Sequence, residues 1–116
     1  MDLNHLHIGV DDIEVSRAFY EQLGFREHVW HGDAMFMRND DGFDLALAPH
    51  GRGVMPEWFH VGCRLDTPDE VRALQRVLAD RVSARGDEPD FVWFRATDPD
   101  GYQLEIYWER ERGLTL

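Results

Sequence analysis

Two histidines, His5 and His60, occupy matched places in two similar halves of this sequence. Each lies in an apolar run, residues 4–10 and residues 59–65, and the two runs align residue by residue. A lone histidine in an apolar strand is usually structural. A pair at repeat-related positions is a better candidate for a shared task, because neutral imidazole is a common metal ligand.

A glutamate joins these histidines in the second half only. Each half continues to a glycine-containing turn and a second apolar run, where Glu105 of the second copy aligns with Ala46 of the first. A carboxylate between apolar neighbours is costly to bury unless it is paired or metal-bound. His5, His60 and Glu105 together would suit a divalent ion of Fe, Mn, Zn, Ni or Co and leave coordination positions open for a substrate.

The elements that must position these residues follow from the hydrophobic pattern. In the first half, strands are expected over residues 3–10, 25–30, 33–38 and 43–48. A helix begins at Asp11 or Asp12, either of which can cap it, and ends at Gly24.

The second half repeats this plan, with strands expected over residues 58–65, 91–96 and 102–108. Thr67 and Glu70 form a capping box with Pro68 at the first helical position. One helix face is expected to be buried, and it consists of Val71, Leu74, Val77 and Leu78. Gly86 and Pro89 indicate a loop before the strand over 91–96.

The sequence therefore predicts an α+β protein built from two βαβββ modules in tandem. A single domain is expected over residues 1–116. It comprises module one over 1–48, a Gly- and Pro-rich linker over 49–57, module two over 58–110 and a tail over 111–116.

Strand parity decides which side chains meet. Gln103, Glu105 and Tyr107 share one face of the closing strand. The apolar side chains on its other face should contact the helix. By the same argument His5 and His60 lie on the face away from the helices, so the three candidate ligands are expected in one cavity.

Composition and charge exclude several classes of function. The net charge of −11 argues against nucleic acid and against anionic membrane surfaces. All twelve basic residues are arginine, so lysine Schiff-base chemistry is excluded. A single cysteine, Cys63, expected as an inert buried thiol, and the absence of a leader at Met1 favour a cytoplasmic protein.

Four segments of the chain, residues 3–8, 16–25, 59–62 and 98–107, resemble motifs of the vicinal oxygen chelate superfamily. This superfamily holds glyoxalases, extradiol dioxygenases, fosfomycin-resistance transferases and bleomycin-resistance proteins. The resemblance implies a cupped eight-stranded mixed sheet and a homodimer. It also implies a divalent metal on His5, His60 and Glu105 that chelates neighbouring oxygens of a small-molecule substrate.

Departures from the superfamily's motifs disfavour some of the reactions that its members catalyse. Ala46 stands where four-ligand glyoxalases carry a carboxylate, which disfavours lactoylglutathione lyase chemistry. Extradiol dioxygenases usually add a histidine and a tyrosine upstream of the glutamate, whereas here no further histidine, and no tyrosine before Tyr102, lies between His60 and Glu105. Dioxygenase and thiol- or group-transfer chemistry are nevertheless preferred to four-ligand isomerisation. The alternative is a protein that sequesters a drug or metabolite without turnover.

Further residues are candidates for the site, and each also has an ordinary structural explanation. His7 is an acid/base candidate or a hydrogen-bonded residue of the cavity wall. Tyr107 could donate to a substrate oxygen or simply line the cavity. The remaining candidates for the substrate pocket are Trp58, Arg64, Trp93, Arg95 and Gln103. Among these the arginines would bind an anionic group, and the tryptophans form an aromatic wall or ordinary packing.

Overall fold

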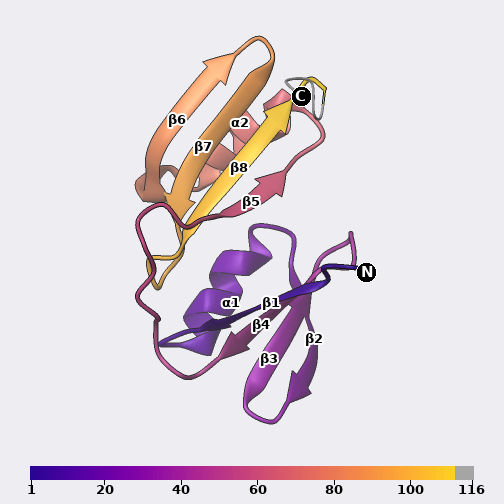
Figure 1. Ribbon diagram of the computed structural model, residues 1–116, viewed down its shortest axis with the longest axis vertical. Helices are drawn as coiled ribbons and strands as arrows, with labels where there is room; N and C mark the ends of the chain where they lie inside the picture. Colours follow the sequence, from indigo (N-terminus) through magenta and orange to yellow (C-terminus); the bar gives the residue numbers. More distant parts are fainter. Residues whose placement is uncertain (112–116) are drawn as a thin grey trace. The chain divides into compact units, whose positions relative to one another are not determined.

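The structure is a computed structural model that describes residues 1–111. It divides into two compact units, residues 1–55 with 99–101, and residues 56–98 with 102–111. Each unit contains one four-stranded mixed sheet and one α-helix (Figure 1). The α+β class and the repeated βαβββ plan are thereby confirmed. Of the tail expected over 111–116, all but residue 111 lies outside the described residues.

The first unit follows the predicted order closely. Its elements are β1 (His5–Gly9), α1 (Ile13–Glu21), β2 (Arg26–His31), β3 (Ala34–Arg38) and β4 (Asp44–Ala48). The sheet order is β1-β4-β3-β2, with β1 parallel to β4. Asp12 caps α1, because its carboxylate accepts from the backbone N–H groups of Glu14 and Val15. Gly24 follows the helix at φ 92°, a conformation that favours glycine.

The second unit has the same topology with one extra turn of helix. Its elements are β5 (Val61–Arg64), α2 (Pro68–Val77), the 3₁₀ turn η1 (Ala79–Arg81), β6 (Val82–Glu88), β7 (Phe91–Thr97) and β8 (Gln103–Glu109). The sheet order is β5-β8-β7-β6, with β5 parallel to β8. Thr67 caps α2 by accepting from the N–H of Glu70, as the capping box predicts.

Three expectations for the second half were wrong. The region of Gly86, expected as a loop, is part of strand β6. The strand expected over 58–65 begins only at Val61, so His60 precedes it. Val77, expected on the buried face of the helix, is 60% exposed, whereas Val71 and Leu78 are buried. At 3.6 residues per turn, Val77 lies about 120° around the helix from Val71 and about 100° from Leu78, which puts it outside the buried face.

The backbone pairing demonstrates the repeat more directly than the sequence does. Opposite His7 in β1 stands Ala46 of β4, and opposite Gly62 in β5 stands Glu105 of β8. Both sheets also contain a register shift at the same place, between Glu27 and Val29 in the first and between Val82 and Ala84 in the second. Glu105 and Ala46 are therefore structurally equivalent within their modules.

Each sheet buries one face against its own helix. In the second unit α2 packs against β7 and β8, and the buried side chains between them include Val71, Val92, Phe94 and Ile106. In the first unit the buried set includes Phe19, Met35, Met37 and Leu47. Within residues 1–111, no helix is both long and apolar enough to cross a membrane.

Candidate functional site

Glu105 lies on the face of the second sheet that points away from α2. Its neighbours along β8, Leu104 and Ile106, are buried on the helix side, so the period of two sends Glu105 to the other side. The carboxylate is still largely covered, with a side chain that is 19% exposed. A carboxylate this enclosed needs compensating partners.

His60 is the first of these partners. Its Nε2 lies 3.2 Å from Oε2 of Glu105. The contact depends on the β5–β8 pairing, because Gly62, two residues beyond His60, stands opposite Glu105 in the parallel register. Two of the three predicted ligands are therefore neighbours within one unit.

The contact made by Nδ1 of His60 indicates whether Nε2 of the same ring donates or accepts. Nδ1 lies 3.3 Å from the carbonyl oxygen of Trp58. A carbonyl oxygen can only accept, so Nδ1 carries the proton and Nε2 of the neutral ring presents a lone pair to Glu105. Two acceptors that face each other at 3.2 Å need a proton or a cation between them. The chemistry of this pair fits a divalent ion, and imidazolium formation is the alternative.

His5 has a matching arrangement in the first unit. Its Nδ1 lies 2.8 Å from the side-chain oxygen of Asn4, so here too Nε2 of the neutral ring is available to a metal. Asn4 was not recognised from the sequence, although its place directly before His5 was a usable signal. Within each unit, the described residues contain no cluster of three or more His, Cys, Asp or Glu side chains that could hold a metal. Because His5 and Glu105 belong to different units, the complete ligand set stays a prediction.

Arg95 is a second partner of Glu105. Its Nε and one Nη donate to Oε2 at 3.4 and 3.3 Å. Arg95 stands directly opposite Glu105 in the β7–β8 register. The sequence suggested Arg95 as a binder of anionic substrate groups, and the structure places its guanidinium on the glutamate.

An aromatic row lies one step along the same face. Trp93 of β7 stands opposite Tyr107 of β8, which in turn stands opposite Arg64 of β5. Phe91 adds a third ring, with centroids 6.5 Å from Trp93 and 6.1 Å from Tyr107. Phe91 was missed as a site residue, although its parity with Trp93 could have revealed it.

The remaining predicted site residues each make contacts that do not involve Glu105. Gln103 donates from Nε2 to the carbonyl oxygen of Glu57 at 2.8 Å. Trp58 is 74% exposed, and its ring lies 6.4 Å from that of Phe59. His7 is an exposed residue of β1 in the first unit, with its ring 6.3 Å from that of His50.

Cys63 is not a candidate nucleophile. It lies on β5 between exposed residues and is turned toward the interior of its unit. Burial raises the pKa of its thiol to about 11, so the thiolate is scarce at neutral pH. Cys63 has intermediate exposure, and the expectation of an inert buried thiol stays a prediction that its raised pKa favours.

Comparison with known proteins decides the family. The family model of the Glyoxalase/Bleomycin resistance protein/Dioxygenase superfamily matches residues 2–106. The chain belongs to this superfamily. The match covers both modules together with His5, His60 and Glu105, and it confirms the resemblance drawn from the sequence. No curated protein matches the chain.

Solved structures with the same fold carry several different names. A possible glyoxalase from Bacillus cereus is 27% identical, with a TM-score of 0.74 over 91% of this chain and 97% of that one. A lactoylglutathione lyase from Agrobacterium tumefaciens is 18% identical, with a TM-score of 0.72 over 97% of each chain. A bleomycin resistance determinant encoded on transposon Tn5 is 22% identical, with a TM-score of 0.69 over 96% of this chain and 100% of that one. This superfamily fold thus occurs in proteins with enzymatic and with resistance names.

Proposed function

We propose that this superfamily member is a divalent-metal-dependent enzyme acting on a small oxygen-rich molecule. Its ligands are His60 and Glu105 of the second unit together with His5 of the first unit, from the same chain or from a second copy. The observation that carries the proposal is the facing pair of Nε2 of His60 and Oε2 of Glu105, with Nδ1 of His60 held by a carbonyl. That arrangement is typical of a histidine prepared for metal coordination.

The surrounding residues would bind and orient the substrate. A divalent ion supplies Lewis-acid stabilisation of negative charge on a substrate oxygen. Trp93, Phe91 and Tyr107 offer aromatic surface to a planar or apolar portion of the substrate. The Tyr107 hydroxyl can donate a hydrogen bond to a substrate oxygen, and the exposed Arg64 opposite it can pair with an anionic group.

A three-ligand set favours dioxygenase or thiol- or group-transfer chemistry over four-ligand glyoxalase isomerisation. Ala46, the structural equivalent of Glu105, is completely buried and has no ligating atom. Oxygen uptake by the Fe(II)-loaded protein over a panel of catechols tests the dioxygenase branch. Thiol consumption with glutathione and an epoxide tests the transfer branch.

Metal binding is tested by calorimetric titration of the metal-free protein with Mn(II), Zn(II) and Fe(II). We expect one ion per intact site, with an affinity that falls at least about tenfold in His60→Ala and in Glu105→Gln. His28→Ala is the matched control, because His28 is exposed at the register shift in β2. Equal affinities in all four proteins would refute the proposal.

The origin of the third ligand can be tested with the same titration. His5→Ala and Glu105→Gln each remove a ligand, so each alone should bind the metal weakly. Mixing the two variants restores intact sites only if His5 and Glu105 of different copies meet in a homodimer. Recovery of binding would show a shared site, and no recovery would place all three ligands in one chain. Light scattering checks the expected homodimer independently.

A second function, sequestration of a drug or metabolite without turnover, is favoured by one observation. Arg95 contacts Oε2 of Glu105, and His60 in its imidazolium form would donate to the same oxygen, so the chain can compensate this carboxylate without a metal. The net charge of −11 would attract a cationic ligand. Unchanged ligand affinity after chelator treatment would favour sequestration over the metal enzyme.

A further inference from the structure

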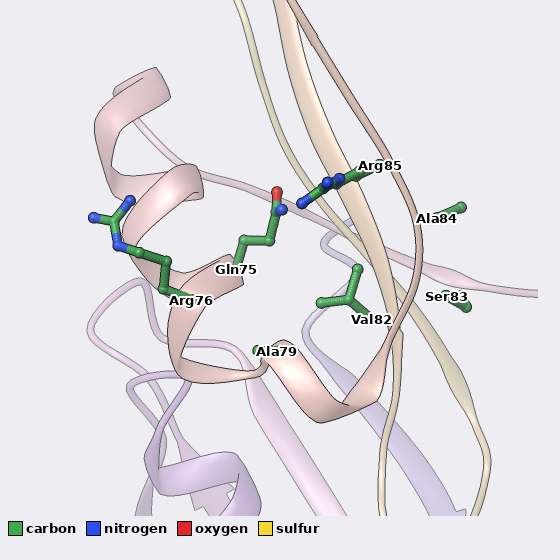
Figure 2. A pocket seen from close by; sticks show the side chains of 7 residues that line it. All are labelled: Gln75, Arg76, Ala79, Val82, Ser83, Ala84 and Arg85. Carbon is green, nitrogen blue, oxygen red and sulfur yellow. The ribbon is translucent and has the colours of Figure 1, made fainter.

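The second unit contains a hollow on the side of its sheet opposite to Glu105. It has a volume of about 360 Å³ and lies between the end of α2 and the start of β6. Its lining residues are Gln75, Arg76, Ala79, Val82, Ser83, Ala84 and Arg85 (Figure 2). The four polar side chains among them can each donate a hydrogen bond, and two of these are guanidinium groups.

Where α2 faces β6, the pairing of charged side chains changes within one helical turn. Arg72 of α2 forms a two-point ion pair with Asp87 of β6, at 2.7 and 2.9 Å. Arg76 lies one turn further along the helix, and Arg85 lies two residues back along the same face of β6. Where the first pair is Arg–Asp, the next is therefore Arg–Arg.

Neither Arg76 nor Arg85 has a side-chain ion-pair or hydrogen-bond partner among residues 1–111. The two side chains therefore keep their charge and their donors available, although acidic residues outnumber basic ones by 23 to 12 in the chain. Figure 2 shows Arg85 extending from β6 toward Gln75, whereas Arg76 is turned away from Arg85. Repulsion between two like charges favours this separation.

We propose that this hollow binds a dianionic phosphoryl group, with Arg76 and Arg85 as the two charged contacts. Gln75 can add an amide N–H, and the two guanidinium groups match the planar two-point recognition that phosphate oxygens accept. The C-terminal end of α2 opposes an anion with about half a negative charge, which two full positive charges outweigh. Arg76 swings toward Arg85 when the anion binds.

The test is a titration with inorganic phosphate at constant ionic strength, followed by the ¹H–¹⁵N NMR signals of residues 75–85. We expect saturable shifts confined to this segment, with a dissociation constant on the order of 1 mM. Arg85→Gln and Arg76→Gln should each weaken binding by about tenfold or more. Arg17→Gln removes the same charge from the first unit, where Arg17 pairs with Glu14 and Glu27, and should leave binding unchanged.

A parallel titration with glycerol 3-phosphate distinguishes a site for a phosphate ester from one for free phosphate. Saturable binding of either supports the proposal, and the tighter ligand identifies the source. Shifts that do not saturate with either ligand, or that persist unchanged in Arg85→Gln, would overturn it.

A charge reversal gives an independent readout that needs no ligand. Arg85→Glu should form an ion pair with Arg76, continuing the Arg72–Asp87 pattern, and so raise the melting temperature by about 1–4 °C. The same variant should lose its phosphate response. A lower melting temperature in Arg85→Glu would contradict the placement of the two arginines as unpaired neighbours. Neither outcome depends on the metal site, because the hollow lies on the other face of the sheet.

Discussion

Arg95 of β7 and Glu105 of β8 stand directly opposite each other, and two nitrogens of the arginine contact the same carboxylate oxygen that faces His60. The distances from Oε2 are 3.3 and 3.4 Å to Arg95 and 3.2 Å to His60. If His60 and Glu105 hold a divalent ion as proposed, Arg95 would compete with that ion for the same carboxylate oxygen and would repel its charge.

Arg95→Gln should accordingly raise metal affinity. The change removes the charge but keeps an N–H donor for Glu105. Two unit charges about 5 Å apart repel by roughly 3 kcal/mol at an effective dielectric constant of about 20, so a gain of tenfold or more is expected. Calorimetric titration with Zn(II) or Mn(II) measures it.

The matched control for this prediction is Arg64→Gln. Arg64 lies on the same sheet and is exposed opposite Tyr107, so its removal changes the net charge equally without freeing Glu105. We expect a smaller gain there. A loss of affinity in Arg95→Gln would instead show that the arginine orients the glutamate for the metal.

The Arg95–Glu105 contact also marks the limit of sequence-based prediction. Parity along the closing strand placed Glu105 opposite to the apolar residues Leu104 and Ile106, as the structure has it. The partner on β7 depends on the register of the hairpin, in which Thr97 pairs with Gln103. The hydrophobic pattern of the two strands does not set this register, so the sequence gives no partner for Glu105 on β7. A slip of one residue moves a side chain to the other face.

Strand β6 was missed for a different physical reason. It is the edge strand of its sheet, and five of its seven residues are exposed. Such a strand has little apolar alternation to detect. Its glycine, Gly86, is typical of a loop in the sequence, although glycine within a strand also marks a close approach of another group. A Cβ at Gly86 would collide with the indole ring of Trp93.

Gly86→Ala should therefore destabilise the protein by about 1–3 kcal/mol, because Trp93 must move to admit the methyl group. Denaturant unfolding measures the free energy, and tryptophan fluorescence of the folded state should change with it. Gly62→Ala is the matched control in the same sheet. A Cβ there would meet Tyr107 at 3.7 Å, an ordinary contact, so its effect should be much smaller. Equal effects of the two substitutions would refute the close approach at Trp93.

The turn between β7 and β8 contains a buried carboxylate, Asp100, that belongs to the first compact unit. Its oxygens accept from the backbone N–H of Asp11 at 3.0 Å and from the hydroxyl of Ser16 at 3.3 Å. The side chain is 6% exposed, so its loss leaves buried donors without an acceptor. Asp100 is thereby bound to Asp11 and to Ser16 of α1 within the first unit.

Asp100→Ala should lower the free energy of unfolding by about 1–3 kcal/mol. Asp41→Ala is the matched control, because Asp41 aligns with Asp100 in the repeat but is exposed. Its effect should stay within about 0.5 kcal/mol. Thermal and denaturant unfolding of the two variants decide the matter. If the two losses were equal, the hydrogen bonds to Asp11 and Ser16 would contribute nothing specific.

A pH dependence follows from Asp44 on β4. Hydrogen bonds from Arg38 hold the pKa of its carboxyl below the usual range, and the attraction of the guanidinium charge adds to this. The two side chains make contacts of 2.6 and 3.0 Å. Because the folded pKa is depressed, this stabilisation is present above the unfolded pKa, near 4, and is lost as pH falls through the folded pKa.

Asp44→Asn should therefore be less stable than the parent protein at neutral pH, by less than about 1 kcal/mol because Arg38 is substantially exposed. The difference should shrink as pH falls below about 4, where the parent protein protonates Asp44. Urea unfolding at a series of pH values measures it. Asp40→Asn, at an exposed turn residue with no ion pair to any of residues 1–111, should lack this convergence. A difference between Asp44→Asn and the parent protein that stays constant down to pH of about 2 would mean that the pair with Arg38 does not depress the pKa of Asp44.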